Sequence, residues 1–212
     1  MISYGKQFID DEDIKAVLNV LSSDWLTQGP KIVEFELALA DYCGSKYAVA
    51  VCNATAALHL ANIAMGTNKN SNVVTTPISF LSTSNSVIYA NGLPIFSDIY
   101  EDVFTLNPKN VEMLLKKDSN IKGIIPVHLG GVVCDMDALK SIADKNNLWI
   151  IEDACHALGG KWIDKNGVTQ TVGNCSNSDI SIFSFHPVKH ITTGEGGAIT
   201  TNSKSLYEKL LK

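Results

Sequence analysis

The sequence predicts an α/β fold in which a mainly parallel seven-stranded sheet is flanked by helices, giving three α/β/α layers. Short apolar segments alternate with helical segments of roughly ten to fifteen residues, which is typical of βαβ units. The apolar segments are continuous rather than alternating, as expected for strands covered on both faces. With 212 residues, 45% of them apolar, the chain is large enough for one domain with a substantial core.

The first 30 residues are predicted to form a helix and an irregular loop. The acidic residues at positions 11–13 suit a helix N-terminus, and Ile14, Val17, Leu18 and Leu21 follow at helical spacing. The loop contains Trp25, Thr27 and Gly29. A second helix is expected after it, ending near Gly44, with four apolar residues facing partly inward: Val33, Phe35, Leu37 and Ala40.

From residue 47 onward the pattern predicts alternating strands and helices. The strands are expected at 47–52, 73–76, 94–98, 123–127, 148–153, 179–185 and 198–201. Helices are expected from Asn53, Ser79, Pro108, Asp137 and Ser203. The polar segment 160–177, with turn residues at 164–167, is predicted to be a small hairpin between two strands.

Composition excludes several classes of protein. The net charge is only −5 and no basic block is present, which argues against nucleic-acid or membrane-surface binding. Residues 1–7 lack the apolar run of a signal peptide, and no stretch approaches the length of a membrane span. The five cysteines lie far apart without a CxxC pair, which favours reduced thiols in the cytoplasm over disulfides or a metal site.

Polar residues that follow the strands are the candidates for a binding site, because ligands of parallel sheets bind at the carboxyl ends of the strands. The helix start at Asn53 offers free N–H groups to an anion, and Thr55 adds a hydroxyl. A simple helix cap is the alternative. Phe80 follows the next strand and can stack on a planar ring, although core packing would also explain an aromatic residue there.

Two further strand ends carry charged residues. Asp153 ends an apolar strand, where an acid is costly unless it is paired; it could also cap the next helix. Its neighbour Glu152 should point to the other face of the sheet. His156 lies three residues on, and a lone histidine of this kind is most often structural. Lys189 follows a strand that ends near Ser184, and glycines come after it.

These residues together indicate a site for pyridoxal phosphate (PLP). A partly desolvated lysine is an effective amine nucleophile, so Lys189 could form a Schiff base with the cofactor. Asp153 could pair with the pyridinium nitrogen, which makes the ring an electron sink. Thr55 and Ser184 could hold the phosphate. The glycine-rich segment 194–197 lacks the spacing of a nucleotide-binding loop. The alternative is an α/β protein without a cofactor, in which every motif is structural.

At these motifs the sequence resembles the DegT/DnrJ/StrS family of nucleotide-sugar aminotransferases, over essentially its whole length. The matching segments are 25–30, 54–61, 128–136, 152–157, 184–189 and 192–198. The sequences of residues 185–202 and 77–80 are similar to those of the branch of the family that makes UDP-4-amino-4,6-dideoxy-N-acetyl-β-L-altrosamine for pseudaminic acid. Perosamine- and bacillosamine-type relatives differ by few residues, so those substrates stay open.

The resemblance implies a fold-type I, PLP-dependent transaminase with glutamate as amino donor and a UDP-4-keto-6-deoxy-N-acetylhexosamine as acceptor. It implies that Lys189 and Asp153 are catalytic. It implies that the cofactor is bound by these two residues with Thr55, Ala56, Phe80, His156 and Ser184. Substrate binding is expected from Trp25, Thr27, Gly29 and His186. For the loop at 25–30, binding of a partner subunit or plain packing of Trp25 are equal alternatives.

Three departures from the family pattern bear on this expectation. Many relatives have glycine at position 54, where this chain has Ala54. Relatives that dehydrate the sugar replace the lysine with histidine, whereas Lys189 is present here and favours transamination. Family members also continue beyond residue 212 into a small C-terminal domain and form homodimers. We therefore expect residues 31–212 to be the PLP-binding large domain of a longer protein, which by itself is either active or an inactive PLP-binding part.

Overall fold

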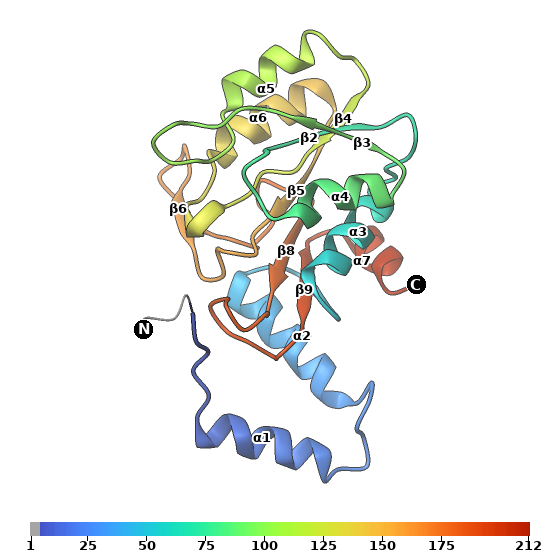
Figure 1. Cartoon of the computed structure of the whole chain (residues 1–212), viewed down its shortest axis with the longest axis vertical. Coiled ribbons are helices and arrows are strands. Elements are labelled where there is room, and N and C mark those ends of the chain that lie inside the picture. The colour runs from blue at the N-terminus through green and yellow to red at the C-terminus, as the bar shows by residue number, and fades with distance from the viewer. Residues whose placement is uncertain (1–4) are drawn as a thin grey trace.

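The computed structural model describes residues 5–212 (Figure 1). Residues 1–4, on which the predictions for the N-terminal segment and for the absence of a signal peptide partly rest, lie outside the described residues. The main sheet is built from seven strands: β1 (Tyr47–Val51), β2 (Asn72–Thr75), β3 (Leu93–Phe96), β4 (Ile121–Ile124), β5 (Trp149–Asp153), β8 (Ile180–Ser184) and β9 (Gly197–Thr201). The helices are α1 (Asp11–Leu21), α2 (Pro30–Cys43), α3 (Ala54–Ala64), α4 (Leu81–Tyr89), α5 (Pro108–Leu115), α6 (Met136–Asn146) and α7 (Lys204–Leu210).

The strand order in the sheet is β1-β9-β8-β5-β4-β2-β3. Neighbouring strands from β8 to β3 pair in parallel, whereas β9 pairs antiparallel with both β1 and β8. The start of β9 therefore lies at the same edge of the sheet as the ends of the other strands. This edge receives the loops that follow β1, β2, β4, β5 and β8.

Helices cover both faces of the sheet, and alternate residues of each strand pack against opposite layers (Figure 1). Val73 and Ile151 pack with α3 and α7, while their neighbours Val74 and Ile150 pack with α5 and α6. Near β8 and β9, residues of α2 complete the second face around Phe183. Burial on both sides explains why the strands have continuous apolar sequences.

The predicted fold class is confirmed, and most predicted elements are present with ends shifted by one or two residues. The predicted hairpin is formed by β6 (Lys161–Ile163) and β7 (Thr169–Thr171), which pair antiparallel. A short 3₁₀ turn at Leu129–Gly131 was not predicted. Its glycines both have positive φ, a backbone conformation that glycine adopts without strain.

The predicted inward face of α2 is partly wrong. Leu39, Ala40 and Cys43 are the buried residues of this helix, whereas Val33 and Leu37 are exposed. The helix contacts the body of the protein mainly through its C-terminal half, so apolar residues near its start lie away from the core (Figure 1). Four apolar residues of α1 are also at least half exposed: Ile14, Val17, Leu18 and Leu21.

Candidate active site

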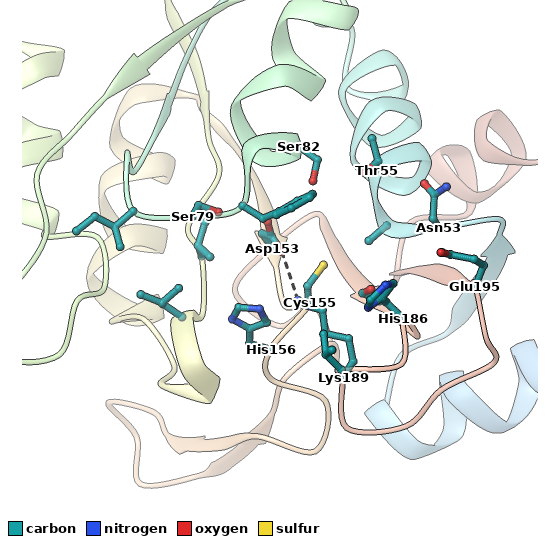
Figure 2. Close-up of a pocket in the computed structure, with 17 residues that line it drawn as sticks. Asn53, Thr55, Ser79, Ser82, Asp153, Cys155, His156, His186, Lys189 and Glu195 are labelled. Carbon is teal, nitrogen blue, oxygen red and sulfur yellow. Dashed lines mark hydrogen bonds between the residues drawn. The ribbon is translucent and has the colours of Figure 1, made fainter. Parts of the chain in front are cut away.

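A pocket of about 650 Å³ lies at the edge of the sheet where the parallel strands end. Its lining comes from the loops and helix starts after β1, β2, β4, β5 and β8 and from the segment before β9. Figure 2 shows Thr55, Asp153, His156 and Lys189 arranged around this cavity. Thr55 comes from the start of α3, Asp153 and His156 from the end of β5 and the loop after it, and Lys189 from the loop between β8 and β9. The volume lies within the range of small-molecule sites, about 300–1,000 Å³.

One side of the pocket is the N-terminus of α3. Asn53 caps this helix, and its Oδ1 accepts a hydrogen bond from the amide of Ala56 at 2.9 Å. Ala54 and Thr55, in the first turn, line the pocket together with Ser184 from the end of β8. Amides of a first turn have no partner within the helix, so this side offers N–H and hydroxyl donors to an anion. Ala56 itself does not line the pocket.

The position of this helix start depends on Gly197, the first residue of β9. A Cβ atom added there would lie 2.4 Å from the carbonyl carbon of Asn53 and 2.6 Å from the amide nitrogen of Ala54. Both contacts are with backbone, which cannot move aside as a side chain can. The absence of a side chain at residue 197 is therefore what allows the start of α3 to reach this edge of the sheet.

We expect Gly197→Ala to displace the start of α3 and to weaken anion and cofactor binding about tenfold or more, since backbone must shift to accommodate the methyl group. PLP titration followed by absorbance measures this effect. Gly5→Ala is the control, because a Cβ at residue 5 meets only Val188 at an ordinary distance of 3.7 Å. Equal PLP affinity in the two variants would contradict the role assigned to Gly197.

The opposite side of the pocket contains a buried carboxylate. Asp153, the last residue of β5, is only 4% exposed and lines the pocket. Its Oδ2 accepts a hydrogen bond from the hydroxyl of Thr83 at 2.6 Å, and its Oδ1 accepts one from the amide of Cys155 at 3.3 Å. Burial and the neighbouring Asp153 charge raise the pKa of the Cys155 thiol well above its ordinary value, so this side chain stays neutral. Asp153 thus brings the negative charge to this wall.

His156 lies on the loop after β5, beside the unpredicted 3₁₀ turn. Its Nδ1 accepts a hydrogen bond from the amide of Gly130 at 3.3 Å. Burial and the charge of Lys189 lower the pKa of His156, and the opposing effect of Asp153 is smaller. The ring is therefore neutral at neutral pH, with its hydrogen on Nε2. It can donate one hydrogen bond from Nε2.

The neighbouring acid, Glu152, points to the other face of the sheet and is fully paired there. Its carboxylate accepts hydrogen bonds from His128 at 2.9 Å, Ser181 at 2.8 Å and Ser178. Burial alone would raise the pKa of Glu152, but these hydrogen bonds and the charge of His128 together outweigh burial and lower it. The two adjacent acids therefore occupy different environments, and Asp153 is the one that faces the pocket.

Lys189 is half-buried in the loop that leads from β8 to β9. It lines the pocket with His186, Val188 and Glu195 of the same loop. The loop is tied down by hydrogen bonds from the Lys189 amide to the His186 carbonyl and from the Thr192 hydroxyl to the Phe185 carbonyl, both 2.9 Å long. This loop places an amine in the same cavity as the carboxylate of Asp153 and the helix start at residue 54.

Phe80, which precedes α4, lies at the rim of the pocket and is 72% exposed. This exposure rules out the alternative of core packing and leaves its ring accessible from the cavity. Trp25 and Gly29 line a second hollow of about 370 Å³ instead, beneath the loop after α1. Glu195 borders both hollows, whereas Thr27 is exposed and borders neither.

Several residues that line the pocket or contact its carboxylate were not predicted, because they do not directly follow a parallel strand. Ser79, Ser82, Thr83 and Glu195 belong to this group. Ser79 lies before α4 and Thr83 lies in its first turn, so helical spacing does not relate the two residues, and no pattern in the sequence indicates that Thr83 contacts Asp153. Glu195 lies before an antiparallel strand, and the sequence did not reveal that this strand starts at the same edge.

Within residues 5–212, no group of three or more His, Cys, Asp or Glu side chains is placed to hold a metal ion. The same part of the chain contains no helix that is both long and apolar enough to cross a membrane.

The fold is that of the fold-type I PLP-dependent transferases, a parallel sheet with one antiparallel strand, and one cavity is lined by an amine, a carboxylate and a helix N-terminus. The model of the DegT/DnrJ/EryC1/StrS aminotransferase family matches residues 7–212, and the chain belongs to this family.

Two curated relatives match nearly the whole chain. A UDP-4-amino-4,6-dideoxy-N-acetyl-beta-L-altrosamine transaminase of Campylobacter jejuni is 43% identical over 210 residues, which cover 99% of this chain and 54% of the relative. A GDP-perosamine synthase of Caulobacter vibrioides is 39% identical over the same number of residues, with the same coverage. The chain thus spans about half the length of these relatives.

Solved structures agree with this family assignment. Helicobacter pylori PseC, an aminotransferase of pseudaminic acid biosynthesis, has a TM-score of 0.88 at 34% identity, covering 99% of this chain and 54% of its own. A sugar aminotransferase of Streptococcus pneumoniae in its PLP form has a TM-score of 0.90 at 28% identity, covering 99% of this chain and 57% of its own. Together with the family match, they identify PLP as the cofactor.

Proposed function

We propose that this chain provides the catalytic large domain of a nucleotide-sugar aminotransferase, which transfers an amino group from glutamate to C4 of a UDP-4-keto-6-deoxy-N-acetylhexosamine. The observation that carries the proposal is that Lys189, Asp153 and the start of α3 line the same pocket. An amine, a carboxylate and an anion-binding helix start complement the aldehyde, the ring nitrogen and the phosphate of PLP respectively.

The residues of the pocket fit this cofactor. Thr55, Ser184 and the first amides of α3 would hold the phosphate, with the amide of Ala56 committed to Asn53. Asp153 would pair with the ring nitrogen, and the exposed ring of Phe80 would stack on the cofactor. His156 would donate from Nε2 to the cofactor's phenolate oxygen or to the substrate, since its Nδ1 already accepts from Gly130.

When bound, PLP withdraws electrons from the carbon that exchanges its proton. Lys189 would bind the cofactor through Nζ and then carry that proton as general base and acid. Asp153 would keep the ring nitrogen protonated, because its carboxylate accepts one more hydrogen bond beside those from Thr83 and Cys155. The start of α3 would fix the cofactor against lateral movement.

The altrosamine precursor in the pseudaminic acid pathway is the acceptor that we favour. Support comes from the 43% identity to the Campylobacter transaminase and from the similarity to the Helicobacter structure. The second candidate is a perosamine-type acceptor, a GDP-sugar, which the Caulobacter relative supports at 39% identity. His186 and Glu195 on one side and the loop at Trp25 on the other are the residues that we propose contact the sugar nucleotide.

The test is amino transfer from glutamate to each of three acceptors by the PLP-loaded chain: the UDP-linked 4-keto sugar of the altrosamine route, its bacillosamine-type epimer, and the GDP-linked 4-keto sugar of the perosamine route. Product formed fastest from the first acceptor supports the proposal, and a preference for either of the others reassigns the substrate. PLP binding without transfer to any acceptor would identify the chain as an inactive PLP-binding domain.

We also propose that the active enzyme is a homodimer. Apolar side chains on α1 and at the start of α4 are exposed, among them Val17, Leu21, Phe80 and Leu81. Phe80 lies at the mouth of the pocket and Leu81 follows it in the chain, so a partner subunit bound there would help to close the pocket. Sedimentation velocity measures the oligomeric state.

A further inference from the structure

The carboxylate of Asp153 is not held by its own strand alone but by a chain of two hydroxyl groups. Thr83 Oγ1 lies 2.6 Å from Asp153 Oδ2 and 2.6 Å from the hydroxyl of Ser79. Thr83 is completely buried, whereas Ser79 and Asp153 both line the pocket. Thr83 therefore connects two pocket residues from behind the wall.

The direction of these hydrogen bonds follows from counting protons. A threonine hydroxyl has one hydrogen and can accept from other donors. While Asp153 is ionised, its oxygens only accept, so the hydrogen of Thr83 points to Asp153 and Ser79 must donate to Thr83. If Asp153 were protonated on Oδ2, the hydrogen bond between Asp153 and Thr83 would have to reverse, and Thr83 would no longer donate to the carboxyl group. The chain of hydroxyls thus favours the ionised carboxylate.

The helix that carries Thr83 reinforces this preference. Thr83 is in the first turn of α4, whose N-cap residue, Phe80, makes no side-chain capping bond. The positive end of the helix dipole lies there, and it stabilises a nearby negative charge. A charge-assisted hydrogen bond of 2.6 Å from a buried hydroxyl is at the strong end for such contacts.

We propose that Thr83 is a positioning residue, which holds Asp153 in its ionised form and in the orientation that leaves the carboxylate directed into the pocket. This inference rests on the proposed function for its purpose, since the proposed partner of Asp153 is the cofactor's ring nitrogen. The hydrogen-bond chain itself belongs to the protein without cofactor and can be measured there.

The matched variants are Thr83→Val, which keeps the shape and removes the hydroxyl, and Thr83→Ser, which keeps the hydroxyl. Thr83→Ala replaces the valine variant if that protein does not fold. The first readout is the titration of Asp153 in the PLP-free protein, followed by NMR of ¹³C-labelled carboxyl groups. The other titratable groups near Asp153 are Cys155, His156 and Lys189, and they are the same in every variant.

We expect the midpoint of the Asp153 titration to move to higher pH in Thr83→Val and to stay near the wild-type value in Thr83→Ser. The second readout is PLP binding, which should weaken about tenfold in Thr83→Val only, as expected for a lost hydrogen bond to a charged group. In the same variant, the ¹⁵N signal of labelled cofactor should move toward that of an unprotonated ring. Ser79→Ala should have a smaller effect, because Thr83 can still donate to Asp153.

Wild-type titration of Asp153 in Thr83→Val, or an equal change in Thr83→Ser, overturns the inference. Failure of the wild-type chain to bind PLP would instead contradict the proposed function, and the PLP-free titration would still decide the role of Thr83. The two claims therefore fail on different measurements.

Discussion

Lys189→Ala is expected to abolish the borohydride-stable attachment of PLP and to lower amino transfer by on the order of 10³-fold or more, because one residue supplies both the covalent contact and the proton carrier. The side chain lies half-buried in the cofactor pocket, away from the tightly packed core, so the variant should fold normally. Absorbance of bound cofactor after reduction and gel filtration measures the attachment.

Lys69→Ala is the control for this variant. Lys69 is an exposed residue of the loop after α3, remote from the pocket residues. Because Lys189 is intact in this variant, PLP attachment should stay at the wild-type level, which shows that loss of a lysine as such has no effect. If Lys189→Ala retained the same bound cofactor as Lys69→Ala, Lys189 would not be the attachment site.

Asp153→Asn is expected to weaken PLP binding about 10- to 100-fold and to slow amino transfer by a comparable or larger factor. The amide has the size of the carboxylate but no negative charge, so the contact with a protonated ring nitrogen loses its charge-assisted hydrogen bond. The amide must also direct its NH₂ group toward either Thr83 or Cys155, both of which donate to Asp153 in the native protein.

The matched control for the acid is Asp164→Asn, in the turn of the β6–β7 hairpin. Its carboxylate also accepts several hydrogen bonds, including backbone donors at residues 166 and 168, and these contacts lower the pKa of Asp164. Asp164 is partly exposed and lies outside the pocket. Loss of PLP affinity in both variants alike would show that the effect of Asp153→Asn is not a property of the site.

The sheet could be predicted because each strand is buried on both faces, which leaves continuous apolar segments between helices in the sequence. The outer surfaces were harder to predict. Periodicity indicates that residues 30–43 form a helix, but it does not say which part of the helix meets the core. Val33 and Leu37 have helical spacing but are exposed, because the buried residues of the helix lie nearer its C-terminal end.

The candidate site could be predicted to the extent that its residues directly follow parallel strands. Thr55, Asp153 and Ser184 satisfy this rule, and the structure places them around one pocket. Thr83 lies in the first turn of α4, beyond the loop that follows β2, and contacts Asp153 through a hydrogen bond. The sequence contains no direct sign of such a contact, because it joins residues 70 positions apart.

The most direct test of the account is the location of the cofactor on the chain. The wild-type protein is loaded with PLP, reduced with borohydride, digested and examined by mass spectrometry. We expect stoichiometric pyridoxyl modification at Lys189 and only traces at the other lysines. A chain that carries no PLP after reduction, or carries it at a lysine outside the pocket, would contradict the proposed site.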